Sequence, residues 1–316
     1  MYHLVMTKNV KLTCAAILLL IAMLLSSCEL ALGEPEEGTM RVLGIGTAAG
    51  TASDDAVDFT NALSSLASRS GRSISVSLIA DTDRAEAQAV TSESIEQSIE
   101  TLATQASDGD ITIVYISGQG WTQSDAKSAD GKGIIYGAKD ARFSSEADYS
   151  SRFCILDAQM KPVVYGDELV DALDEIPGTV ILITDCDHSG ALVGSKSIEV
   201  DSTDFDASSA DLTANLFSAS SVDSSKVQIL ASARRYQAKA AGKALGDVNH
   251  SAFTAVLLEG LGYDQNTESV ASMPDACQDG RVSINSLYRF VSDACEGSAE
   301  TPKMSSRLID TVLFTF

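Results

Sequence analysis

The chain has 316 residues, of which 44 are acidic and 22 basic, and 45% are hydrophobic. This composition excludes an intrinsically disordered chain, and the length allows one large domain or two small ones. The net charge of −22 argues against a nucleic-acid partner, because phosphate backbones are bound by clustered lysines and arginines. Six cysteines are too few for a scaffold built on disulfides, and three histidines leave little room for a histidine-rich metal site. We therefore expect no metal and no cofactor.

The first 27 residues have the pattern of an export signal. Two lysines precede an apolar run at 15–25, and the stretch Leu25-Ser-Ser-Cys28 resembles a bacterial lipobox. In such signals the cysteine is lipidated and becomes the new N-terminus. We therefore expect lipidation at Cys28, a polar tether at 28–39, and a protein anchored by lipid to the cell envelope, outside the cytoplasm. An uncleaved anchor and an ordinary signal peptide are the alternatives.

Export would place the remaining cysteines in an oxidising compartment. Cys154, Cys186, Cys277 and Cys295 allow three sets of pairs, and sequence alone does not choose among them. We favour a Cys277–Cys295 bond, because these two residues flank one predicted helix.

From residue 40 on, apolar runs alternate with amphipathic segments, so one α/β domain is expected over 40–316. The amphipathic segments predict helices, the first capped by Ser53 or Asp54, the second by Ser92, and the fourth opening at His250, on the surface or in a cap. The strands are too continuously apolar for a sheet with one wet face, which favours a mostly parallel sheet of about six strands with helices on both faces. Strands are expected at 40–46, 73–79, 111–116, 179–184, 227–231 and 311–316, and helices at 54–69, 92–106, 167–176, 250–260 and 284–291.

The segment 197–225 differs in composition from the rest of the domain. It has six acidic residues and many serines, with no lysine or arginine between Lys196 and Lys226. Such a composition predicts a solvated surface loop or linker.

Two strand ends carry residues with unusual chemistry. The third predicted strand ends in Ser117-Gly-Gln-Gly120, and the fourth ends in Asp185-Cys-Asp-His-Ser-Gly190. Open parallel sheets place their sites beyond the carboxyl ends of strands. These two loops therefore form the predicted functional face.

The two loops resemble the signatures of the caspase-fold peptidases, and especially of their metacaspase-like bacterial branch. In that family the first loop reads Ser-Gly-His-Gly, and its histidine is the general base. The second loop reads Asp-x-Cys-His-Ser-Gly, and its cysteine is the nucleophile. The resemblance covers nearly all of 40–316 and implies a caspase-like three-layer sandwich.

Both catalytic positions depart from the family pattern. Gln119 stands in the position of the histidine, and its amide cannot relay a proton near neutral pH. Asp187 stands in the position of the cysteine, and a carboxylate is a far poorer nucleophile than a thiolate. Because a catalytic dyad works as a unit, the loss of both members predicts an inactive peptidase centre.

The resemblance also implies a binding pocket. The family residue that matches Asp185 helps to form an acidic pocket for a lysine or arginine side chain, and Asp187 would add a second carboxylate. The hypothesis is that the site binds a basic peptide or protein segment, or a divalent cation, without cutting anything. In the alternative, purely structural interpretation, these carboxylates only accept hydrogen bonds from the loop backbone. The other retained residues expected at this site are Ser117, Gly118, His188, Ser189 and Gly190.

Two rival functions stay open. A working peptidase or hydrolase with a rearranged centre would use Cys186, although its sulfur is expected to point into the core because neighbouring strand residues face opposite sides. A structural envelope lipoprotein would use the fold only as a scaffold.

Overall fold

The computed structural model describes residues 38–48, 50–121, 153–190, 192–193, 199–200, 225–233, 242–245, 248–296, 301–305 and 310–316. By their contacts, residues 38–316 group into one unit. The expected signal segment, the lipidation at Cys28 and nearly all of the acidic loop 197–225 lie outside the described residues.

A seven-stranded sheet in the order β2-β1-β3-β7-β9-β15-β8 is the centre of the fold. Its first five strands run parallel, and the short strands β15 and β8 extend it in antiparallel pairing. The sheet is therefore mostly parallel, as predicted, and slightly wider than expected. The bounds are β1 (Met40–Gly46), β2 (Ile74–Ala80), β3 (Ile111–Ser117), β7 (Thr179–Asp185), β8 (Glu199–Val200), β9 (Gln228–Ala231) and β15 (Lys303–Ser305).

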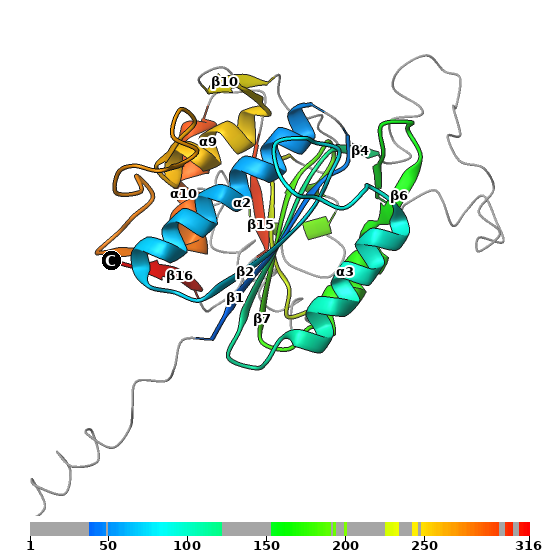
Figure 1. Cartoon of the computed structure of the whole chain (residues 1–316), viewed down its shortest axis with the longest axis horizontal. Helices are drawn as coiled ribbons and strands as arrows, with labels where there is room; N and C mark the ends of the chain where they lie inside the picture. Colours follow the sequence, from blue (N-terminus) through cyan, green and yellow to red (C-terminus); the bar gives the residue numbers. More distant parts are fainter. Residues whose placement is uncertain are drawn as a thin grey trace, which may run out of the picture. The chain divides into compact units, whose positions relative to one another are not determined.

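Helices cover both faces of this sheet, which confirms the three-layer sandwich (Figure 1). One face carries α2 (Thr51–Ser70), α9 (Ala252–Gly260) and α10 (Ile284–Ala294). The other face carries α3 (Ser92–Gln105) and α6 (Gly166–Asp174). Among the described residues, no helix is long and apolar enough to cross a membrane.

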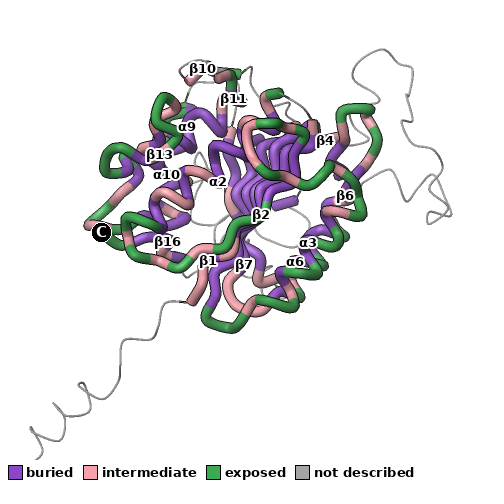
Figure 2. The backbone as a smooth tube through the Cα atoms, viewed as in Figure 1, coloured by how far each residue is buried: buried purple, intermediate pink, exposed green. Residues whose placement is uncertain are grey.

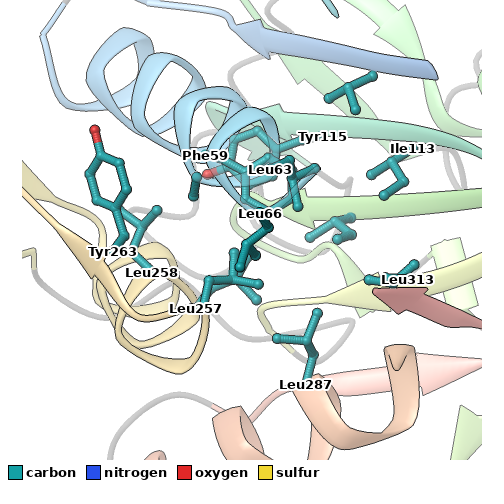
Figure 3. Close-up of a cluster of buried hydrophobic side chains, with 14 of the residues drawn as sticks. Phe59, Leu63, Leu66, Ile113, Tyr115, Leu257, Leu258, Tyr263, Leu287 and Leu313 are labelled. Atoms are coloured by element: carbon teal, nitrogen blue, oxygen red, sulfur yellow. The ribbon is translucent and has the colours of Figure 1, made fainter. Parts of the chain in front are cut away.

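Successive residues of the central strands feed two separate cores. Along β3, Ile113 and Tyr115 pack on the α2/α9/α10 side, which we call the α2/α9 core, whereas Val114 and Ile116 pack in the α3/α6 core. The strands β1, β3 and β7 consist almost entirely of buried residues (Figure 2), as their continuous apolar character predicts, whereas the edge strand β2 is partly exposed. In the α2/α9 core, Tyr115 stacks on Phe59 with ring centroids 4.4 Å apart (Figure 3). Burial of each such side chain stabilises the fold by about 2 kcal/mol.

Two helix starts differ from the sequence prediction. The N-cap of α2 is Gly50, with φ of 76°, so Ser53 and Asp54 lie inside the first turn. The N-cap of α3 is Thr91, because its side chain and that of Ser94 exchange hydrogen bonds in a capping box. Ser92 is therefore the first residue of α3 rather than its cap.

Several short strands fall outside the central sheet. The predicted last strand, β16 (Val312–Thr315), pairs with β14 (Arg281–Ser283) instead of extending that sheet. Beyond the end of β3, β4 (Gln119–Trp121) forms a small antiparallel sheet with β5 (Cys154–Leu156) and β6 (Pro162–Tyr165). Two hairpins complete the set, namely β10 (Lys243–Leu245) with β11 (Val248–His250), and β12 (Tyr263–Asp264) with β13 (Ser269–Val270).

None of Cys154, Cys186, Cys277 and Cys295 forms a disulfide. The favoured Cys277–Cys295 bond is therefore not present. Cys295 is instead buried in the α2/α9 core, and Cys277 packs against the same core.

Candidate functional site

The two loops singled out by the sequence meet at the ends of neighbouring strands. The last residues of β3 and β7, Ser117 and Asp185, are parallel register partners, and the Gly118 N–H donates to the Asp185 carbonyl at 3.2 Å. Two residues beyond each strand end lie Gln119, the first residue of β4, and Asp187, in the loop after β7. At Gly120 a Cβ would stand only 1.8 Å from the Asp187 carbonyl oxygen, so the β4 backbone packs directly on the second loop. The structure therefore brings the two substituted family positions together.

Exposure separates these residues into two groups. Gln119 is exposed and Asp187 is half-buried. The remaining predicted site residues are buried, namely Ser117, Gly118, Asp185, His188, Ser189 and Gly190. Gln119 and Asp187 are thus more accessible to solvent than the other residues of the two loops.

Ser189 and Gly190 connect the second loop to the end of β9. The Gly190 N–H donates to the Ala233 carbonyl at 2.7 Å, and Ser189 Oγ accepts from the Ala233 N–H at 3.2 Å. Ser232 Oγ donates to the Cys186 carbonyl at 3.3 Å. His188 lies in this turn with φ of 61°, in the left-handed region that few non-glycine residues adopt. These bonds show how the loop keeps its shape.

Cys186 lies on the other side of the sheet from the buried carboxylate beside it. Its side chain is fully buried in the α3/α6 core, with Sγ 3.9 Å from the Ile116 carbonyl oxygen. Asp185 follows Ile181 and Ile183 in strand alternation and therefore falls on the α2/α9 side. The sequence expectation that the sulfur of Cys186 points into the core is confirmed.

The Asp185 carboxylate is fully buried at the start of α9. Its Oδ2 atom accepts from Ser251 Oγ, from Thr254 Oγ1 at 2.5 Å and from the Thr254 N–H at 3.2 Å. Its Oδ1 atom has no hydrogen-bond partner among the described residues. One side of this carboxylate is therefore satisfied by the helix N-terminus, and the other side is not.

A second buried carboxylate, Asp55 of α2, joins the first loop to the residues before α9. Its Oδ2 atom accepts from Ser117 Oγ at 2.7 Å. Its Oδ1 atom lies 2.9 Å from His250 Nδ1 and accepts from the Ser251 N–H at 3.2 Å. Burial raises the pKa of Asp55, and the nearby charge of Asp185 raises it further.

Asp58, one turn along α2, completes an acidic cluster with Asp55 and Asp185. It binds Arg84 at 2.7 Å and accepts from the Tyr263 hydroxyl at 2.9 Å. Burial acts to raise the pKa of Asp58, but the hydrogen bonds from His250 and Arg84 outweigh it and lower the pKa below its usual value. Arg84 also binds Asp54 and Glu268, so the segment after β2 is held against this cluster.

His250 is fully buried between the two α2 carboxylates. Its Nδ1 faces Asp55, and its Nε2 lies 3.3 Å from Asp58 Oδ2 and 3.2 Å from Gln265 Oε1. Burial alone would lower the pKa of His250, but the hydrogen bonds to Asp55 and Asp58 raise it to about 9. The expectation that His250 is a surface or cap residue is wrong, because it is the last residue of β11 and points into the acidic cluster.

Sequence reasoning missed Asp55, Asp58 and His250 as site residues. A signal was present, because Asp55 and Asp58 are spaced i, i+3 on the same apolar face as Phe59, where buried carboxylates need partners. Their partner, His250, lies almost two hundred residues away, and no local pattern connects them. Among the described residues, no group of three or more His, Cys, Asp or Glu side chains could hold a metal ion.

The chain was compared with solved structures, curated sequences and family models. The crystal structure of a protein from Geobacter sulfurreducens is similar at 13% sequence identity and a TM-score of 0.47, over 87% of this chain and 93% of the other. No curated protein sequence matches the chain. The family model described as the caspase domain of the C14 peptidases matches residues 49–312, which is most of the sequence. The chain therefore belongs to the caspase-domain family.

Proposed function

We propose that this caspase-domain protein has no peptidase activity and binds a lysine or arginine side chain of a peptide or protein segment at Asp185. The observation that carries the proposal is the Asp185 Oδ1 atom, which is buried without a hydrogen-bond partner among the described residues. A buried, unsatisfied carboxylate oxygen is costly, and an incoming ammonium or guanidinium group would satisfy it with a charge-assisted hydrogen bond.

The charges around Asp185 support a cationic ligand. Asp55 and Asp185 are close enough for their charges to interact. Among the described residues, the cation that contacts Asp55 is His250. Arg84 is engaged instead with the outer carboxylates Asp54, Asp58 and Glu268. The inner part of the cluster thus has an excess of negative charge that attracts a cation and repels an anion.

The two substituted positions support the absence of cleavage. An amide at Gln119 and a carboxylate at Asp187 stand where the family has its base and its nucleophile. The rival hydrolase would rely on Cys186, whose burial in the α3/α6 core on the far side of the sheet favours a structural role.

Burial of Asp185 has a kinetic consequence for this function. Because the carboxylate is fully buried, a ligand reaches it only when covering side chains move. We therefore expect association slower than about 10⁵ M⁻¹s⁻¹, the lower end of the usual range for binding without a conformational change.

We further propose that the domain is anchored outside the cytoplasm through lipid on Cys28. The proposal rests on the lipobox-like stretch Leu25–Cys28 behind an apolar run. Expression with an alkyne fatty acid should label the wild-type chain, whereas Cys28→Ala should lose the label and Cys14→Ala should keep it. Equal labelling of wild type and Cys28→Ala would contradict the anchor.

The binding test uses calorimetry with the full-length chain and the peptide acetyl-Ala-Ala-Arg-Ala-Ala-amide. Its control is the same peptide with citrulline, which is nearly isosteric with arginine but neutral. We expect the arginine peptide to bind and the citrulline peptide to bind at least about tenfold more weakly, because only the former neutralises Asp185. Equal affinity for the two peptides would overturn the pocket and favour the scaffold role.

A variant of Asp185 tests whether its carboxylate binds the arginine side chain. Asp185→Asn keeps an oxygen for Ser251 and Thr254 but removes the charge, so arginine-peptide affinity should fall at least about tenfold. Circular dichroism establishes that the variant folds, and the citrulline comparison decides the question if it does not. Arginyl and lysyl aminomethylcoumarin peptides should give no turnover, and turnover that Asp187→Ala abolishes would refute the inactive centre.

A further inference from the structure

His250 is an internal cation built into the acidic cluster. Both ring nitrogens face acceptors, since Nδ1 lies 2.9 Å from Asp55 Oδ1 and Nε2 lies 3.2–3.3 Å from Gln265 Oε1 and Asp58 Oδ2. A neutral imidazole has only one N–H and would turn a lone pair toward one of these acceptors. The geometry therefore fits an imidazolium with both nitrogens donating.

His250 and the proposed ligand position share the same carboxylates. The next residue, Ser251, donates from Oγ to Asp185 and from its backbone N–H to Asp55. Asp55 thus lies between the imidazolium and Asp185, and its charge interacts with both. A ligand cation at Asp185 and the His250 imidazolium would both be attracted to the Asp55 carboxylate. The two positive charges would also repel each other strongly, because the interior contains little water.

We propose that a cationic side chain binding at Asp185 displaces the proton of His250, so that the site exchanges one positive charge for another. The proposal rests on the proposed function and adds its regulation. The net step is His250-H⁺ plus ligand cation giving neutral His250, bound cation and a proton released to solvent. No covalent bond other than one N–H is broken.

The surrounding groups indicate which nitrogen loses the proton. Asp58 keeps two other donors, Arg84 at 2.7 Å and the Tyr263 hydroxyl at 2.9 Å, when Nε2 is deprotonated. Asp55 has weaker alternatives, namely the Ser117 hydroxyl and the Ser251 N–H. The bound state should therefore hold the Nδ1–H tautomer, still donating to Asp55.

Among the described side chains around the cluster, the two tyrosines and Arg84 supply no competing switch in this pH range. Burial and nearby carboxylates raise the pKa of Tyr115 and of Tyr263, and carboxylates raise that of Arg84, so these groups keep their protons. The β10 register partner of His250 is Lys243. The groups in contact with His250 are Asp55 and Asp58 of α2 and Gln265 of the β12–β13 hairpin. The groups around these carboxylates are Arg84 after β2, Tyr115 of β3, Asp185 of β7, and Tyr263 and Glu268 at the same hairpin.

The proposed proton exchange predicts the direction in which ligand affinity changes with pH. The pKa of His250 in the unliganded protein is about 9, and a bound cation lowers it. Ligand affinity should therefore rise as the pH increases from 7 toward 9, by up to about tenfold per pH unit, and become constant above the unliganded pKa.

The test counts protons by calorimetry of the full-length chain with acetyl-Ala-Ala-Arg-Ala-Ala-amide at pH 8. The titration is run in phosphate and in Tris, whose ionisation enthalpies differ. The peptide has blocked ends and does not titrate here, so released protons come from the protein. We expect release of about one proton or a large fraction of it. Observed heats of binding that are equal in the two buffers, which means no net proton release, would overturn the exchange but leave the proposed function standing. Absence of binding would overturn both.

Two variants and one spectrum separate exchange from a structural role. His250→Gln should abolish proton release and bind the arginine peptide more tightly than wild type at pH 7, because the competing cation is gone. His3→Gln, which changes a histidine outside the caspase-domain match, should release the wild-type number of protons. If His250→Gln does not fold, ¹⁵N-histidine spectra of the wild type decide, since the peptide should convert the His250 signal from imidazolium to the Nδ1–H tautomer. An unchanged His250 signal at saturating peptide would contradict the proposal.

Discussion

Ser117 and Asp185 are register partners on the last residues of β3 and β7, and the residues two places beyond them are Gln119 and Asp187. Under the proposed function, these neighbouring strand ends carry an amide and a carboxylate where the family has its base and its nucleophile. Gly120 extends this arrangement, because its backbone packs on the Asp187 carbonyl.

The adjacency of the ends of β3 and β7 predicts that two substitutions give the chain peptidase activity. Gln119→His combined with Asp187→Cys should cleave arginyl aminomethylcoumarin peptides, because both side chains would project from strand ends that already lie in register. Each single variant should remain inactive, since neither group works alone. A double variant that folds, binds the arginine peptide and still gives no turnover would show that the surrounding groove no longer supports catalysis.

Close packing at Gly120 predicts a large cost for one methyl group. Gly120→Ala would place a Cβ 1.8 Å from the Asp187 carbonyl oxygen and 2.7 Å from the Phe153 ring, so a loop must shift. We expect a loss of about 3 kcal/mol and a Tm lower by roughly 5–10 °C in calorimetry. Gly109→Ala is the matched control, because its Cβ would approach nothing closer than 4.0 Å. Similar melting of the two variants would contradict this packing.

Stability should fall as the pH rises toward 9. The pKa of His250 is raised from 6.5 to about 9 in the folded protein, so its contribution is complete below about pH 6.5 and is lost through pH 9. The loss amounts to about 3 kcal/mol at most and is measured by urea unfolding at pH 6.5–9.5. His250→Gln should flatten this part of the profile, whereas His3→Gln, outside the caspase-domain match, should keep it. A wild-type profile that is level over this range would disprove the assignment.

Burial of Cys186 predicts that its thiol resists alkylation in the folded protein. Iodoacetamide treatment followed by mass spectrometry should label the half-buried Cys277 first and leave Cys186 unmodified until the chain is unfolded. Rapid labelling of Cys186 under native conditions would revive the rival hydrolase with a rearranged centre.

Local sequence patterns were sufficient to predict most of the central strands and the helices. The apolar runs of β1, β3 and β7 identify buried parallel strands, because only a sheet covered on both faces tolerates them. Alternation along β7 then predicts that Asp185 and Cys186 point to opposite sides, as observed. Short elements such as β4 and the β10–β11 hairpin escaped prediction, because three residues carry too little periodicity.

Local patterns along the chain are enough to predict the alternation of strands and helices, the place of the two loops at the carboxyl ends of strands, and the chemical groups at positions 119 and 187. The surroundings of Asp185, in contrast, depend on contacts between distant parts of the chain. The partners of the acidic cluster come from α2, the segment after β2 and the residues before α9, which are far apart in the chain. Buried charges choose partners by proximity in three dimensions, so a histidine that looks like the start of a surface helix becomes the cation of a buried site.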